Sequence, residues 1–236
     1  MNKIDLLLGG DIGDWALDNV PAPAIGHVIT LDDQIAERAQ SLGHSTILGN
    51  ANSLDYQPAP YGFSVHYPAI LKPEFLNKYR KTYNLHPGYL PWGRGYYPIF
   101  WALWEQTPAG ATLHEISPGI DEGPIVAQTQ VQYNEGDTGG SLFLRVRQAE
   151  QNLFLKYLPL IIEGKDIPTE PQASGGSYHR KREFDELKHQ ADWDQMSAKD
   201  LVRLARAFTF PGHSGLELAV GSHRVEISLN SLSKVD

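Results

Sequence analysis

Short apolar runs alternate with stretches of helical periodicity over the first two thirds of the chain. The runs with the length of buried strands are residues 4–8, 27–30, 45–48, 63–67, 82–85, 111–116 and 125–131. Apolar residues recur at helical spacing over 33–42, 73–79, 99–106 and 138–160, and glycines at 9–13 predict a turn after the first strand. Strands separated by helices predict an α/β fold around a mostly parallel sheet.

The composition changes to Pro, Gly, Ser and Gln over residues 165–177, which predicts a linker. We therefore expect an α/β domain at residues 1–170 and a smaller α+β subdomain at 171–236. In the subdomain, residues 198–208 have helical periodicity, and 216–220 and 224–229 predict a hairpin.

Composition and charge narrow the class of protein. The chain has 236 residues, 41% of them hydrophobic, which is enough to bury a core. Its 20 Lys and Arg against 28 Asp and Glu give a net charge of −8, and this disfavours nucleic acid as a partner. The absence of cysteine excludes disulfides and thiolate chemistry, and the histidines show no metal-ligand spacing, so no metal is expected. The apolar runs are too short for a membrane helix or a signal peptide, so we expect a cytoplasmic protein without membrane contact.

The end of the strand at 82–85 carries the most informative residues. Asn84 and His86 alternate, so they share one face of the strand, and Pro87 ends it. Ligands of open α/β sheets bind at the carboxyl ends of strands. There an amide can stabilise an oxyanion and an imidazole can move a proton, although an isolated pair of this kind is more often a structural hydrogen-bonded pair. Asp121, in a turn between glycines, could orient the imidazole or be an ordinary turn residue.

Three segments together resemble the folate-dependent formyltransferase family, which includes glycinamide ribonucleotide, methionyl-tRNA and sugar-nucleotide N-formyltransferases. They are Asn84-Leu85-His86-Pro87-Gly88 with the following Leu-Pro-x-x-Arg-Gly loop, Thr112-x-His114, and Gly119-Ile120-Asp121-Glu122-Gly123-Pro124. The resemblance implies a Rossmann-like core with helices on both faces. It also implies formyl transfer from N10-formyltetrahydrofolate to an amine, with Asn84, His86 and Asp121 as the catalytic residues. His114 is expected in the core or in support of the site.

The resemblance further implies which segments hold the folate. They are the segment before the catalytic strand and the loop that carries Asp121, and the residues concerned are Ile70, Leu71, Leu76, Ser117, Gly119, Ile120 and Asp121. Some relatives have Arg where this chain has Ala69, so that contact is absent. For Ile70, Leu71 and Leu76, plain core packing is the alternative.

The acceptor is expected to be the amine of a nucleotide-linked amino-deoxysugar, often a dTDP sugar. The chain is too acidic for tRNA, and the region before Pro60 has two basic residues against eight acids, which disfavours the phosphate of glycinamide ribonucleotide. The residues expected to bind the acceptor are Tyr89, Trp92, Arg94, Gly95, Tyr96, Tyr178 and Arg180. A loop-fixing role for Arg94 and a solvated basic turn at Arg180 are the alternatives.

The resemblance implies a role in bacterial surface-polysaccharide precursors, such as the O-antigen of lipopolysaccharide. Glycinamide ribonucleotide formyltransferase activity and a noncatalytic folate- or nucleotide-binding module remain alternatives. The sequence leaves open the sugar, the C3 or C4 position of its amine, the base and the oligomeric state, a homodimer included.

Overall fold

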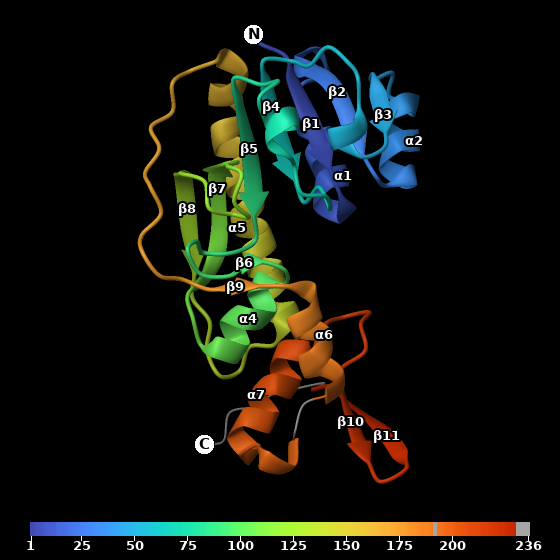
Figure 1. The fold of residues 1–236 in the computed structure, drawn as a ribbon, viewed down its shortest axis with the longest axis vertical. Coiled ribbons are helices and arrows are strands. Elements are labelled where there is room, and N and C mark those ends of the chain that lie inside the picture. The colour runs from blue at the N-terminus through green and yellow to red at the C-terminus, as the bar shows by residue number, and fades with distance from the viewer. Residues whose placement is uncertain (191–192, 230–236) are drawn as a thin grey trace. The chain divides into compact units, whose positions relative to one another are not determined.

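The sheet of the computed structural model, which describes residues 1–190 and 193–229, has seven strands in the order β3-β2-β1-β4-β5-β7-β8 (Figure 1). The strands are β1 Ile4–Leu8, β2 Ile25–Thr30, β3 Thr46–Leu48, β4 Tyr61–Val65, β5 Lys81–His86, β7 Ala109–Glu115 and β8 Ile125–Val131. Neighbours from β3 to β5 pair in parallel, and β7 pairs antiparallel with β5. The expected mostly parallel α/β sheet is confirmed.

Helices follow most strands. They are α1 Gly10–Asp18, α2 Asp33–Ser41, α3 Pro73–Leu76, α4 Pro98–Glu105, α5 Gly139–Glu163, α6 Lys181–Gln190 and α7 Ala198–Phe208. Short 3-10 turns are η1 Ala22–Ala24, η2 Ala51–Ser53 and η3 Trp193–Gln195, and the smaller strands are β6 Arg94–Gly95, β9 Tyr178–His179, β10 Leu216–Val220 and β11 His223–Ile227. In the part of the chain that the structure describes, no helix is both long and apolar enough to cross a bilayer.

Two helices differ from the sequence expectation. The predicted turn at 9–13 is the start of α1, where Ile12, Ala16 and Leu17 are buried at helical spacing. The charged helix α6 was not predicted, because it lacks a clear apolar stripe. Ion pairs between side chains four residues apart stabilise it, such as the pair of Lys181 with Asp185.

The chain forms two compact units, each built from three segments. Unit 1 comprises Met1–His86, Thr112–Gln128 and Glu150–Gln172. Unit 2 comprises Pro87–Ala111, Thr129–Ala149 and Ala173–Asp236. This grouping does not follow the expected division at residue 170, which stays a prediction about which part of the chain folds by itself.

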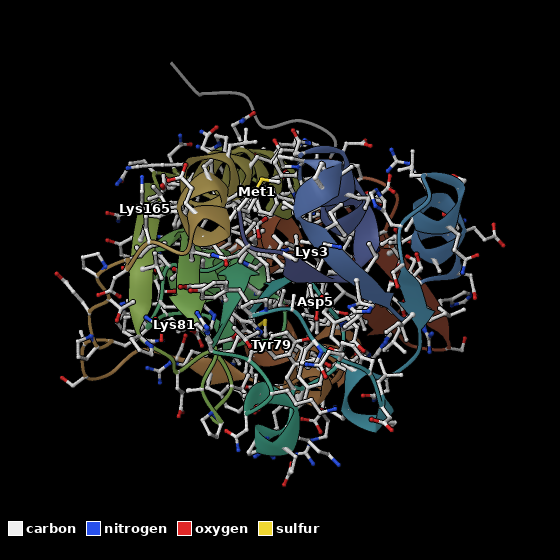
Figure 2. All side chains as sticks on the ribbon, turned by 90° about the horizontal axis from the view of Figure 1, so that it is seen from above. Met1, Lys3, Asp5, Tyr79, Lys81 and Lys165 are labelled. Carbon is white, nitrogen blue, oxygen red and sulfur yellow. The ribbon has the colours of Figure 1, made fainter. Side chains whose placement is uncertain are left out.

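A buried carboxylate joins the strands of unit 1. Asp5, on β1, accepts hydrogen bonds from the backbone N–H groups of His27 (2.9 Å) and Ala59 (3.0 Å) and from the hydroxyl of Tyr79 (3.0 Å). The side chains of Asp5 and Tyr79 are labelled in Figure 2. Burial, and then the nearby Asp5 charge, raise the pKa of Tyr79, so its hydroxyl stays protonated and donates. Gly26 leaves room for this network, since a Cβ there would lie 2.4 Å from Asp5 Oδ1. The network fixes β1, β2 and the segment before β4 to one another.

In unit 2, Asp137 lies just before α5. Burial raises its pKa, but hydrogen bonds from the Asn134 N–H, the Ser141 hydroxyl and the Arg145 guanidinium outweigh this, so the pKa lies below its usual range. A depressed pKa means that the folded state holds the proton less tightly than the unfolded chain. The carboxylate therefore stabilises the fold above its unfolded pKa, and the stabilisation is lost as pH falls through the folded pKa.

We expect Asp137→Asn to lower the free energy of unfolding by about 1–2 kcal/mol at neutral pH. The difference from the parent should shrink in acid, because the parent carboxyl then becomes protonated. Urea unfolding from neutral to acidic pH measures this, with the exposed Glu135→Gln as control. A difference that stays constant with pH would contradict the assignment.

Candidate active site

The register of β5 and β7 groups four polar side chains in unit 1. Asn84 lies opposite His114, and His86 lies opposite Thr112. Residues that alternate on one strand, and their direct partners on the next, point to the same face of a sheet. The amide and the imidazole expected to carry chemistry therefore share a face with a second imidazole.

The loop after β7 brings a carboxylate to this face. Asp121 has a positive φ of 53°. Its Oδ2 lies 3.6 Å from His86 Nδ1, and its Oδ1 lies 3.6 Å from His114 Nε2. The structure thus brings Asn84, His86 and Asp121 together, although the aspartate is 35 residues from the histidine in sequence.

Close backbone packing shapes that loop. A Cβ at Gly123 would lie 1.7 Å from the carbonyl oxygen of Glu115, so this position requires glycine. Gln172 donates from Nε2 to the carbonyls of Asp121 (2.7 Å) and Gly123 (2.9 Å). Sequence reasoning placed Gln172 in a linker and missed its contact, because no local pattern connects it to the loop.

His114 fixes the orientation of the Asn84 amide. Its Nδ1 lies 2.8 Å from the Glu115 carbonyl oxygen, which can only accept, so Nδ1 carries the hydrogen. The unprotonated Nε2 then accepts from Asn84 Nδ2 at 3.1 Å. One N–H of the amide is used in this way, and the other has no partner among the residues that the structure describes. The expectation of a supporting role for His114 agrees with this geometry.

Replacing His114 with phenylalanine is expected to lower kcat about tenfold, because the amide loses the acceptor that fixes its rotation. His114→Gln keeps a side-chain acceptor and should recover part of the loss. Steady-state kinetics with both substrates varied measures the effect. Equal kcat in the parent and the phenylalanine variant would show that Asn84 does not depend on His114.

The residues expected to hold folate are in unit 1 but differ in accessibility. Leu71 belongs to a buried cluster with Phe75, and Leu76 packs against that cluster. Ile70 is 63% exposed and is free to contact a ligand. The loop between β7 and β8 carries Asp121 and also contains Ser117, Gly119 and Ile120, which precede the aspartate by one to four residues. Binding by these residues remains a prediction.

The residues expected to bind the acceptor lie in unit 2, from two distant segments. Strand pairing places Arg94 beside Tyr178 and Gly95 beside His179. Gly95 has φ of 85°, and a Cβ there would lie 2.3 Å from the His179 carbonyl oxygen. Tyr96, Tyr178 and Arg180 are exposed, whereas Tyr89 and Trp92 are half-buried. The predicted acceptor residues on β6 and β9 are thus neighbours.

Buried histidine–carboxylate pairs were not found from the sequence. His66, with a positive φ of 52°, places Nε2 2.7 Å from Oε1 of the buried Glu150 in α5. The available signal was the position of Glu150, four residues after Val146 and three before Leu153 on the apolar stripe. Among the described residues, no group of histidines and acids has an arrangement that could hold a metal ion.

The family model described as formyl transferase matches residues 49–158, the segment that contains Asn84, His86 and Asp121. Residues 49–158 are a formyl transferase domain. The chain is 32% identical over 105 residues to dTDP-4-amino-4,6-dideoxyglucose formyltransferase of Mycobacterium bovis, and the match covers 44% of each chain. The chain therefore spans less than half the length of this curated relative.

Two solved structures extend the comparison beyond the formyl transferase domain. A 4-N formyltransferase from Francisella tularensis matches 99% of both chains with a TM-score of 0.83 at 20% identity, which concerns the fold alone. The formyltransferase PseJ from Anoxybacillus kamchatkensis matches 84% of this chain and 96% of its own with a TM-score of 0.60 at 29% identity. That protein was solved with UDP-4,6-dideoxy-4-formamido-L-AltNAc and tetrahydrofolate.

Proposed function

We propose that this chain transfers a formyl group from N10-formyltetrahydrofolate to the amine of a nucleotide-linked amino-deoxysugar. The observation that carries the proposal is the grouping of an amide, an imidazole and a carboxylate at the end of β5, inside a formyl transferase domain. The acceptor class is supported by the sugar-nucleotide relatives. No helix of the described residues could span a membrane, and we propose a cytoplasmic site of action.

The side chains of Asn84, His86 and Asp121 fit a formyl-carrying folate. The Asn84 amide is held with one N–H unused, the His86 ring is nearly enclosed, and the Asp121 carboxylate is near its Nδ1. When bound, the folate supplies an electrophilic formyl carbon. Asn84 donates to the formyl oxygen as negative charge develops on it, which is where a preorganised donor lowers the barrier most. Charge stabilisation by this amide needs no metal ion.

His86 moves the proton in this mechanism. Its imidazole accepts a proton from the attacking amine and returns one to the nitrogen that loses the formyl group. Asp121 stabilises the charged ring through Nδ1. The present 3.6 Å separation is longer than a hydrogen bond, and catalytic hydrogen bonds commonly tighten when ligands bind.

The proposal is tested by incubating the full chain with N10-formyltetrahydrofolate and a panel of amines. The panel contains dTDP- and UDP-linked 3-amino and 4-amino deoxysugars, with glycinamide ribonucleotide as the competing acceptor. We expect tetrahydrofolate release and a formamido product with at least one sugar nucleotide. Transfer to glycinamide ribonucleotide alone would favour that alternative, and folate binding without transfer to any amine would indicate a noncatalytic module.

A further inference from the structure

The ring of His179, in unit 2, contacts one aromatic ring and two carboxylates. It stacks on Trp101 of α4 with 3.7 Å between ring centroids and 10° between planes. Nε2 lies 2.9 Å from Oε1 of Glu105, and Nδ1 lies 3.1 Å from Oε2 of Glu183. The side chain is only 14% exposed.

Two carboxylates, those of Glu105 and Glu183, lie on opposite edges of this imidazole. A carboxylate only accepts, so the hydrogen bond between Nδ1 and Glu183 is donated by the ring, while Nε2 is in close contact with the Glu105 carboxylate. A hydrogen bond from the Arg180 backbone N–H, together with His179, lowers the pKa of Glu183. The lowered pKa keeps Glu183 ionised, so it is available as the acceptor for Nδ1 of His179.

The position of His179 gives this set of contacts a function. The residue lies on β9, where it pairs with Gly95 of β6, and its carbonyl oxygen accepts from the Tyr96 N–H at 2.9 Å. Its ring contacts α4 through Trp101 and Glu105, and α6 through Glu183. His179 thus connects β9 to a second strand through its backbone and to two helices through its ring.

The residues on either side of His179, Tyr178 and Arg180, indicate which surface is held in place. Tyr178 and Arg180 are exposed, and Tyr178 is the strand partner of Arg94. Aromatic faces stack on nucleotide bases, and guanidinium groups donate in pairs to phosphate oxygens. An acceptor surface made from two segments 84 residues apart requires that β9 be held in register.

We propose that His179 is a positioning residue for the nucleotide part of the acceptor. Held between Glu105 and Glu183, it fixes β9 so that Tyr178 and Arg180 lie beside Arg94 and Tyr96 as one binding surface. This inference rests on the proposed function and adds to it the device that assembles the acceptor site.

The test compares His179→Phe, which retains a ring to stack on Trp101 but loses both ion pairs, with Glu105→Gln, which removes one charge. We expect the KM for the sugar nucleotide to rise about tenfold in His179→Phe and by a smaller factor in Glu105→Gln. The kcat and the KM for formyltetrahydrofolate should stay within about twofold of the parent, because unit 1 carries the reacting groups. His189→Phe is the matched control, since His189 also pairs with a carboxylate, that of Glu217, but is exposed on α6.

Binding of dTDP and of UDP alone, measured by calorimetry, gives a readout independent of turnover. Weaker binding of whichever nucleotide binds the parent, with unchanged folate binding, supports the inference. An unchanged KM for the sugar nucleotide in both variants overturns the inference. A parallel fall in kcat and in kcat/KM for both substrates also overturns it, because that result indicates a merely structural role. If the parent itself transfers no formyl group, the proposed function fails, and the calorimetry still tests the nucleotide site.

Discussion

The variant His86→Ala is expected to lose formyl transfer, with kcat reduced about 10²–10⁴-fold, because the imidazole that moves the proton is removed. Asn84→Ala should lose about 10²–10³-fold, since a positioned donor to the developing oxyanion is lost. Both side chains are polar and lie in the last three residues of β5, so neither change removes apolar packing and neither should unfold the protein. Single-turnover rates at saturating formyltetrahydrofolate separate this chemical effect from weaker donor binding.

The control for these variants is His223→Ala, an exposed histidine of β11 that is remote in sequence from β5. It should retain parental kcat. Circular dichroism and thermal unfolding confirm that the β5 variants are folded. If His86→Ala and Asn84→Ala both keep the parental turnover, the mechanism proposed for this site is wrong.

The second large effect concerns stability. Asp5→Ala is expected to lower the free energy of unfolding by about 3–5 kcal/mol, because several buried donors lose their acceptor at about 1–3 kcal/mol each, with partial relaxation. The donors are the N–H groups of His27 and Ala59 and the hydroxyl of Tyr79. Chemical denaturation of the full chain measures the change.

Asp18→Ala provides the matched control. Asp18 is also in unit 1 and is paired with Arg38, but its side chain is 54% exposed. Exposed ion pairs contribute about 0–1 kcal/mol, so this variant should unfold close to the parent. If both aspartate variants lose the same stability, the buried network does not hold the strands as described.

Much of the fold could be predicted from local pattern. The buried strand at Ile4–Leu8 and the helix expected over residues 33–42 follow from residues next to each other, and the structure confirms both. The helix α6 could not be predicted in this way, since its stabilising pairs are charged and its apolar contacts, such as Phe184 against Phe100 and Phe208, join distant segments. The prediction of a turn at 9–13 was wrong because burial of Ile12 outweighs the helix-weakening effect of the glycines.

For the candidate site too, the sequence predicted part of the arrangement and missed the rest. The sequence by itself determined that Asn84 and His86 share one face at a strand end, because side chains alternate along a strand. It also carried the motif that resembles the formyltransferases, and the segment with that motif is now matched to the family.

Only the tertiary structure decided which groups meet. The antiparallel register of β5 and β7 set His114 against Asn84, the loop closed by Gly123 and Gln172 brought Asp121 to His86, and strand pairing put Tyr178 beside Arg94. The physical reason is that register and loop closure depend on contacts between segments far apart in the chain, where hydrogen bonds and burial are shared by residues that no local pattern connects.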